Sequence, residues 1–440
     1  MQPDRPLNPG QSTAIAAAAL VLGAALRLAW GTDIEFKSDE QYMFLRATTA
    51  GLPEAFSWLG MPSGVYIKNP GMSAWIFVLL AKIFHITTPA GLARAVQLLN
   101  VGAIALAVFV SFRFARTFRE RETWLWASLL AAVNPLALLF HRKIWAQSLL
   151  PFFVMLLFIS WWRRDRRTGA FFWGLGGACL GQIHMSGFFL AAAVVLWTLI
   201  AKKTRQERRP PAWRAWLLGS MLGALPLIPW AVHLLSNRKP HPPIFKAGEI
   251  WQLKYWVFWV SEAAGLHLGN TLGVRNGNGT FEQLGDFLRY PLLGRGGDPS
   301  YLVGAAHAML VVFCALVILL TLRAAWQNRH TPLLVAGLGK NQDATALLSG
   351  AAAIPCGILL TLSMITIRRY YLLVTFPLVY VWLAGTFISG YGARRGRMLL
   401  IALAAAQLFI SANFLWYIHH NGGSTHGDYG VAYSRQKTAR

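Results

Sequence analysis

Residues 33–69 read DIEFKSDEQYMFLRATTAGLPEAFSWLGMPSGVYIKN, a polar stretch that follows the first apolar segment of the chain. It holds five carboxylates, Asp33, Glu35, Asp39, Glu40 and Glu54, among the cations Lys37, Arg46 and Lys68. Only 13% of the 440 residues are charged, whereas about a quarter is usual in a soluble protein. Because charge is so scarce, we expect the carboxylates beside the first membrane crossing to have a function, and we predict that they include a general base.

Apolar stretches bounded by arginine clusters recur along the rest of the chain, which is typical of transmembrane helices. We predict an all-α polytopic membrane protein with about 11 crossings. The first, residues 13–31, is predicted to be an uncleaved helix in which Arg27 snorkels to the interface. The other expected crossings are 92–112, 123–140, 145–162, two short ones between 167 and 202, 215–235, 301–326, 344–367, 370–389 and 398–417. Residues 70–84 are predicted to lie along the outer interface.

The net charge of +24 comes from arginine and lysine runs in the short connections, such as those at 113–121, 163–167, 202–214 and 394–397. This distribution indicates cytoplasmic loops and contact with anionic membrane lipids, so no nucleic-acid partner is expected. The polar stretch then falls on the outer face. We expect a multi-pass protein of the inner (plasma) membrane whose active site faces the outside or the periplasm.

Three regions are predicted. Residues 1–235 form a transmembrane catalytic module with the outer loop 32–91. Residues 236–300 form a flexible outer-face loop with a Trp-rich amphipathic segment at 250–264, and residues 301–440 form the C-terminal helices and tail.

Cys179, Cys314 and Cys356 lie inside apolar segments, so no disulfide framework is expected. Cysteine, histidine and carboxylate spacings indicate no metal site. No cofactor is predicted, and a divalent metal has no support in the sequence.

The outer loop has two local signals. Ser38 followed by Gln41 matches a capping box, which would place Asp39 and Glu40 in the first turn of a helix, where a negative charge is favoured. Residues 66–70, Tyr-Ile-Lys-Asn-Pro, place Lys68 just before a proline that can begin a helix, where an anion is favoured. The simpler interpretations are ordinary first-turn acids and a snorkelling lysine.

Other polar residues fall on the same face by helix parity. They are Arg142 and Lys143 after residues 123–140, His184 between the two short crossings, and Arg368 and Arg369 before residues 370–389. An anionic lipid phosphate at the outer leaflet would account for the cations. Ion pairing with the loop carboxylates is the alternative, and a structural role is the alternative for His184.

These motifs together resemble type-C (GT-C) membrane glycosyltransferases, in the branch of the protein O-mannosyltransferases and the lipid A aminoarabinose transferases. The similar segments are Ser38-Asp39-Glu40 with Tyr42, Lys68-Asn69-Pro70 with Trp75, Asn134-Pro135 to Trp145 with Pro151, Gln182-Ile183-His184, and Arg369 to Leu372 with Pro377. They cover residues 13–200 well and the remainder thinly.

The resemblance implies an inverting transfer of a hexose or pentose from a polyprenyl-phosphate-linked donor to a hydroxyl of a lipid, glycan or protein in the cell envelope. It implies that Asp39 is the base with Glu40 as its helper, that Lys68, Arg368, Arg369 and Arg142 bind the donor phosphate, and that His184, Lys143, Tyr66 and Tyr370 line the substrate cavity. The chain departs from the aminoarabinose transferases at Ile67 and Asn69, where an acid and a second proline are usual, and at Trp145 and Gln147, where an acid is often found.

Two other classes compete with this interpretation. A polytopic transporter or lipid flippase for an anionic lipid-linked substrate predicts inverted repeats with matching broken helices, and the sequence shows one clear break, at His184. A membrane scaffold without catalytic activity has no need for carboxylates and cations on one face.

Overall fold

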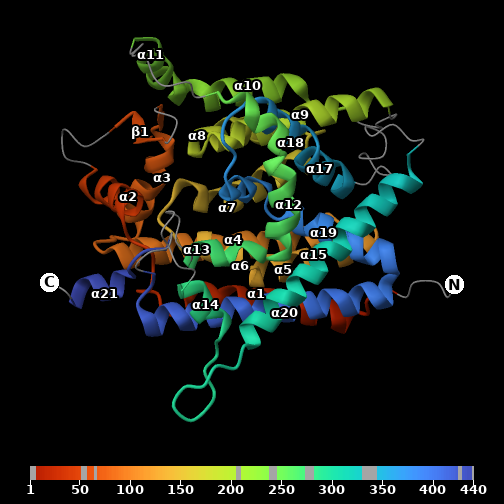
Figure 1. Cartoon of the computed structure of the whole chain (residues 1–440). Coiled ribbons are helices and arrows are strands. Elements are labelled where there is room, and N and C mark those ends of the chain that lie inside the picture. Colours follow the sequence, from red (N-terminus) through yellow and green to blue (C-terminus); the bar gives the residue numbers. More distant parts are fainter. Residues whose placement is uncertain are drawn as a thin grey trace.

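The computed structural model describes residues 6–50, 57–63, 67–204, 210–236, 245–272, 282–329, 344–424 and 429–438. The described chain is a bundle of helices with one two-stranded antiparallel hairpin, formed by β1 (Leu59–Pro62) and β2 (Lys68–Pro70). Figure 1 shows many of the long helices lying roughly side by side, with the short helix α12 (Lys254–Ala264) crossing them in the middle of the view. The predicted class, an all-α polytopic membrane protein, is confirmed.

Within the described residues, six helical segments are long and apolar enough to cross a membrane. They are α1 (Pro9–Leu28), α4 (Pro89–Arg113), the run of α10 (Trp213–Ala224), η1 (Leu225–Leu227) and α11 (Ile228–Ser236), α15 (Leu302–Gln327), the pair α17 (Ala344–Ala353) and α18 (Pro355–Leu362), and α20 (Ala393–Asn421). A seventh is bent by 81° between η4 (Arg369–Thr375) and α19 (Leu378–Tyr391). Four further predicted crossings correspond to shorter helices: α5 (Phe118–Val133) with α6 (Pro135–Phe140), α7 (Ala146–Trp162), α8 (Arg167–Ile183) and α9 (Ser186–Thr204). The count of 11 stays a prediction.

Arg27 is fully buried, so the prediction that it snorkels to the interface is wrong. Pro135 separates α5 from α6 and has no N–H to donate to the carbonyl of Ala131. The Nη2 of Arg27 donates to that carbonyl at 2.9 Å, and its Nη1 donates to Ala132 at 2.8 Å. An unpaired carbonyl is costly away from water. Arg27 therefore stabilises the break in the neighbouring helix.

A second break lies between α17 and α18, where Pro355 begins the new helix. The short helix α12 (Lys254–Ala264) covers it: the hydroxyl of Tyr255 donates to Ala352 O at 2.5 Å and the indole N–H of Trp256 donates to Ala353 O at 2.8 Å. α12 also packs on α15 and α19. The Trp-rich segment that the sequence placed in a flexible loop is therefore packed against three helices.

The remaining elements between residues 245 and 300 are short: η2 (Ala247–Gln252), η3 (Leu266–Leu268), α13 (Gly269–Leu272) and α14 (Glu282–Leu288). Residues 237–244 and 273–281 lie outside the described part of the chain, so the flexibility predicted for them is not tested. The three predicted regions also stay predictions.

Several short elements lie together at one end of the bundle (Figure 1). α2 (Ser38–Thr49), α3 (Met72–Ile83), the hairpin and α21 (Tyr433–Thr438) gather at one end of the bundle, at the left of Figure 1. The last turn of α20 carries His419, which contacts Asp33, so the start of this 29-residue helix lies at the other end. α3 matches the helix predicted at 70–84, but it begins after Gly71 because Pro70 belongs to β2. The fold thus separates the polar stretch 33–69 (the acidic loop) from the arginine run at 394–397.

This two-ended arrangement predicts opposite membrane sidedness for Gln41 and Arg395, which are both exposed. In a variant lacking the three cysteines, Gln41→Cys should react with a membrane-impermeant maleimide added to intact cells. Arg395→Cys should react only after permeabilisation. The reverse pattern would contradict the outer position of the acidic loop, and labelling of both from one side would contradict the two-ended arrangement.

Candidate active site

The turn between α6 and α7 holds three consecutive basic side chains, His141, Arg142 and Lys143, all of them buried. The Nδ1 of His141 lies 2.8 Å from the Nη2 of Arg27. The Nη1 of Arg142 donates to the carbonyls of Arg27 and Ala29, both at 2.7 Å. These carbonyls end α1 and have no partner within the helix. The turn therefore fastens α6 and α7 to the end of α1.

Arg142 was predicted to bind the donor phosphate. Its Nη2 also donates to the carbonyls of Trp30 at 3.0 Å and Asp33 at 3.3 Å. Both terminal nitrogens are thus engaged by the main chain. The phosphate-binding role of Arg142 stays a prediction. In the structure, Arg142 caps the C-terminal end of α1.

Lys143 forms a buried ion pair with Glu35 of the acidic loop. The second oxygen of Glu35 lies 2.8 Å from the Nζ of Lys37, which is half exposed. A buried carboxylate needs such partners because removing its charge from water costs several kcal/mol. This pair joins two segments more than 100 residues apart and brings the loop beside the α6–α7 turn.

Asp39 and Glu40 lie in the first turn of α2, as predicted, but the helix begins one residue earlier than the capping box indicated. Lys37 is the N-cap residue, and Glu40 is the third helical residue. The Oε2 of Glu40 accepts a hydrogen bond from the main-chain N–H of Lys37 at 3.3 Å. Ser38 lies inside the first turn, so the prediction that it caps the helix is wrong. Glu40, at the third helical position, makes the return hydrogen bond of a capping box to the N-cap residue Lys37.

Glu40 is 1% exposed, and its Oε1 has no hydrogen-bond partner among the described residues. Burial, followed by the negative charge of Glu35, raises the pKa of Glu40 to about 7, although Lys143 acts in the opposite direction. Burial also raises the pKa of Asp39, which is partly offset by Lys143. Both carboxyls therefore bind a proton more tightly than ordinary surface acids do.

An aromatic wall continues from Lys143. Its Nζ lies 4.6 Å from the ring centre of Trp145 and 5.2 Å from that of Phe140. Tyr370 packs edge-on against both rings. Its own ring lies 6.4 Å from the ring of His184. Contacts thus run without interruption from Glu35 to His184.

The wall also includes the cation Arg369, which lies over Phe140 at 5.7 Å and donates to the hydroxyl of Thr271 at 2.8 Å. His184 is the C-cap of α8, and its Nδ1 lies 2.7 Å from the Oγ of Ser186. The structure therefore brings together Lys143, His184 and Arg369, which helix parity had placed on one face, and adds Tyr370, which the resemblance had placed in the cavity.

Lys68 and Arg368 are exposed. β2, which carries Lys68, packs on α8, the helix that ends at His184. The carbonyl of Lys68 accepts a hydrogen bond from the indole of Trp230 at 2.7 Å, which holds β2 against α11. Within the described residues, no ion pair joins the ammonium of Lys68 to a carboxylate. Tyr66 lies outside the described residues.

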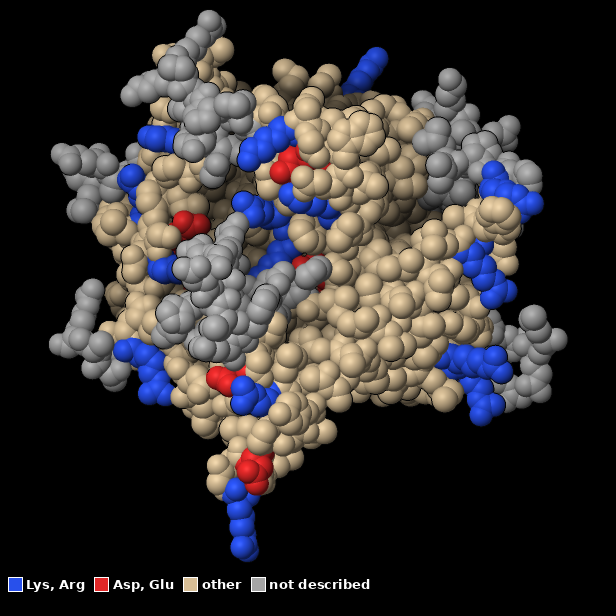
Figure 2. Space-filling model, in the orientation of Figure 1, with Lys and Arg blue, Asp and Glu red and all other residues tan. Residues whose placement is uncertain are grey.

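Figure 2 shows a hollow on this face of the molecule with lysine and arginine side chains around it. Within the described part of the chain, no three His, Cys, Asp or Glu side chains are grouped so that they could hold a metal ion. The described site presents carboxylates, cations and aromatic rings.

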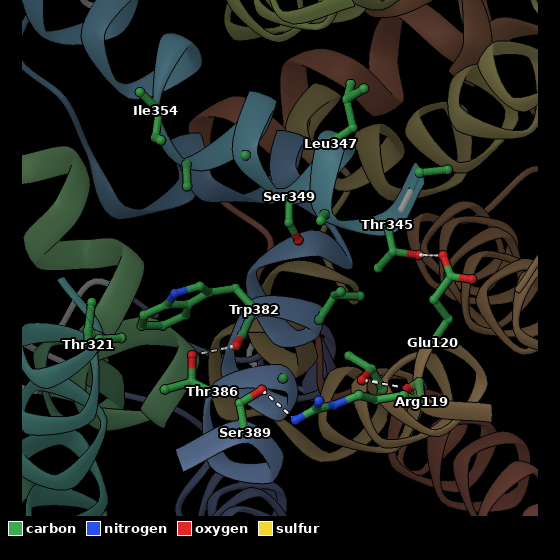
Figure 3. A pocket seen from close by; sticks show the side chains of 18 of the residues that line it. Arg119, Glu120, Thr321, Thr345, Leu347, Ser349, Ile354, Trp382, Thr386 and Ser389 are labelled. Carbon is green, nitrogen blue, oxygen red and sulfur yellow. Dashed lines mark hydrogen bonds between the residues drawn. The ribbon is translucent and has the colours of Figure 1, made fainter. Parts of the chain in front are cut away.

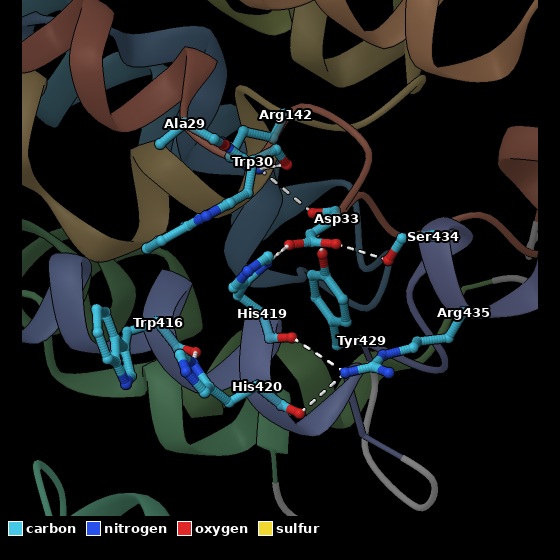
Figure 4. Close-up of polar contacts among 10 residues, drawn as sticks. All are labelled: Ala29, Trp30, Asp33, Arg142, Trp416, His419, His420, Tyr429, Ser434 and Arg435. Atoms are coloured by element: carbon cyan, nitrogen blue, oxygen red, sulfur yellow. Dashed lines mark hydrogen bonds and ion pairs between the residues drawn. The ribbon is translucent and has the colours of Figure 1, made fainter.

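Residues near the C-terminus bind Asp33 of the acidic loop (Figure 4). The sequence did not predict this contact. Asp33 accepts a hydrogen bond from Ser434 at 2.6 Å through one oxygen, and its other oxygen lies 2.6 Å from the Nδ1 of His419. Tyr429 donates to the main-chain carbonyl of Asp33 at 2.7 Å. Asp33 is thus a structural anchor, joined to residues almost 400 positions away that carry no local signal.

No family model and no curated protein matches the chain. Among solved structures, it is similar to the archaeal oligosaccharyltransferase AglB from Archaeoglobus fulgidus, in complex with an inhibitory peptide and a dolichol-phosphate. The TM-score is 0.47 and the identity 11%; the match covers 94% of this chain and 56% of that one. A similarity of this size supports no argument about function.

The pKa of Glu40 predicts a pH-dependent stability. The folded state retains the proton of Glu40 up to about pH 7, whereas an unfolded chain releases it near pH 4.3. The free energy of unfolding should therefore fall by about 3 kcal/mol between these values. In detergent, the melting temperature of Glu40→Gln relative to the unchanged protein should rise from pH 4.5 to pH 7.5.

Asp298→Asn is the matched control, because that carboxylate is exposed and far along the chain. Its melting temperature should follow that of the unchanged protein at every pH. A difference between Glu40→Gln and the unchanged protein that stays constant with pH would contradict the raised pKa.

Proposed function

We propose that this protein is an inverting membrane glycosyltransferase that moves a sugar from a polyprenyl-phosphate carrier to a hydroxyl acceptor. The observation that carries the proposal is the Glu35–Lys143 ion pair. It places two carboxylates of raised pKa beside a wall that combines cations with Trp145, Tyr370 and His184. Such a site offers a base for a hydroxyl, rings that can stack on a sugar, and positive charge for a phosphate.

Asp39 is the better base of the two carboxylates. A general base must come within hydrogen-bond reach of the proton it accepts. Asp39 is partly exposed, whereas Glu40 is buried and its Oε2 is bonded to the start of α2. The raised pKa of Asp39 makes it a stronger base than an ordinary aspartate. Glu40 supports Asp39 by fixing the first turn.

In the proposed reaction the acceptor oxygen attacks the anomeric carbon from the face opposite the phosphate. The bond between that carbon and the phosphate oxygen breaks, and the phosphate leaves with the electron pair. Asp39 takes the proton of the acceptor hydroxyl. Positive charge that faces the leaving phosphate lowers the barrier, because negative charge gathers there as the bond breaks.

Lys68, Arg368 and Arg369 are the proposed contacts to that phosphate. Lys68 and Arg368 are exposed at the same end of the bundle as the acidic loop. Lys143 faces the carboxylates and is paired with Glu35, so it lines the cavity and also sets the charge of the site. Arg142 is not a proposed phosphate contact, because it donates hydrogen bonds to the carbonyls at the end of α1.

The proposed donor is a polyprenyl-phosphate hexose or pentose, and the proposed acceptor is a lipid, glycan or protein of the cell envelope. We place the reaction at the outer face of the plasma (inner) membrane. This sidedness rests on the arginine run at 394–397, which lies at the opposite end of the bundle from the acidic loop.

A lipid transporter is the second candidate, and one observation favours it. The breaks at Pro135, at Pro355 and between η4 and α19 give three discontinuous helices, which are common in transporters. Both classes would bind the same anionic lipid. They differ in whether the bond between sugar and phosphate is broken.

Asp39→Asn should lower sugar transfer by about 10²- to 10⁴-fold, the usual contribution of a general base. The assay uses purified protein in liposomes, polyprenyl-phosphate hexoses and pentoses labelled in the sugar, and envelope extract as the acceptor. Asp298→Asn should retain full activity, and the melting temperature should verify that both variants are folded.

Full transfer by Asp39→Asn would remove Asp39 as the base. Labelled donor that crosses the bilayer intact, without transfer to any acceptor, would instead establish the transporter.

A further inference from the structure

A second cavity lies at the opposite end of the bundle from the acidic loop, with a volume of about 1810 Å³. It is lined by the start of α5, the last turns of α15, much of α17 and the part of α19 from Val381 to Gly390 (Figure 3). Sites for small molecules usually have volumes of about 300–1,000 Å³. This cavity is therefore large enough for a bigger ligand.

Positive charge predominates at one end of the cavity. Arg116, Arg119, Arg164 and Arg323 line it there, against two acids, Glu120 and Asp165. Glu120 is buried and already satisfied: its Oε1 accepts from the hydroxyl of Thr345 at 3.0 Å and its Oε2 accepts from the main-chain N–H of Arg116 at 2.6 Å. The lining thus has an excess of two positive charges, which favours an anionic group.

The remainder of the cavity is apolar and aromatic. Trp256, Trp259 and Trp382 line it toward the middle of the bundle, together with Leu320 and Leu347. Ser349 points into the space in Figure 3, and its Oγ is buried without a hydrogen-bond partner among the described residues. A cavity with cations at one end and apolar rings at the other matches an amphiphile.

The position of the cavity indicates where that amphiphile comes from. Its two facing walls, α15 and the α17–α18 pair, are both candidate membrane spans. α15 exposes much of its apolar surface, including Leu319 and Leu322 at 61% each, and its lining residues Arg323 and Ala324 are exposed as well. A ligand between these helices can enter sideways from the bilayer.

We infer that this cavity binds an anionic glycerophospholipid of the leaflet opposite the acidic loop. Its phosphate group lies among Arg119, Arg164 and Arg323, and its acyl chains extend between α15 and α17 toward Trp382. The site is separate from the proposed active site and does not depend on the proposed function. It assigns a defined binding site to arginines for which the sequence predicts only a general contact with anionic membrane lipids.

The test uses the full-length protein, delipidated in detergent and titrated with phosphatidylglycerol in native mass spectrometry. We expect retention of one phosphatidylglycerol and little retention of zwitterionic phosphatidylcholine. Arg323→Gln should weaken binding about fivefold, because one cation beside a lipid headgroup contributes about 1 kcal/mol. Arg395→Gln is the matched control, since Arg395 is an exposed arginine at the start of α20 that does not line the cavity.

A second pair of variants tests the apolar part. Ala324→Trp places a large ring in the cavity and should abolish binding, whereas Leu322→Trp, on the exposed face of the same helix and outside the lining, should leave it unchanged. Both positions are exposed, so neither change disturbs the packed core.

Four outcomes would overturn the inference. They are equal retention of phosphatidylglycerol and phosphatidylcholine, equal effects of the cavity variants and their controls, displacement of the lipid by inorganic phosphate alone, and preferred retention of polyprenyl phosphate. The last would assign the cavity to the carrier lipid instead.

Discussion

The turn at residues 141–143 fixes the end of α1 and the segment that follows it. Its three basic side chains bind three partners in order: His141 binds Arg27, Arg142 binds the carbonyls at the end of α1, and Lys143 binds Glu35. All three are removed from water, so each interaction is both strong and costly to leave unmade. Together they set the direction in which the chain leaves α1 and therefore where the acidic loop lies.

The same physical rule explains the helix breaks. A proline inside a membrane helix leaves carbonyls without donors, and the chain must supply side chains to satisfy them. Arg27 does so for α5, and Tyr255 and Trp256 do so for the break between α17 and α18. The breaks at α5–α6 and at η4–α19 also bring Phe140 and Tyr370 together, and these rings join Lys143 to His184. The discontinuities of the fold therefore build the candidate site.

Hydrophobic patterning predicted the helices well, because each apolar run is a local property of the chain. Helix parity placed Lys143, His184 and Arg369 on one face, and the structure brings them into one set of contacts with Tyr370. The identity of each polar partner was not predictable. Ion pairing with the loop carboxylates was the alternative interpretation of the outer-face cations, and the contact of Lys143 with Glu35 confirms it for that lysine. Arg142 and Asp33 bind residues more than 100 positions away, and no local pattern encodes such contacts.

We propose that Lys68, Arg368 and Arg369 face a carrier phosphate within reach of Asp39. An experimental structure of the protein with polyprenyl phosphate would test this arrangement. We predict phosphate density among these three cations, with Asp39 facing the position that a sugar on the phosphate would occupy. Phosphate density at the opposite end of the bundle, or at a place where Asp39 cannot reach the sugar, would rule the arrangement out.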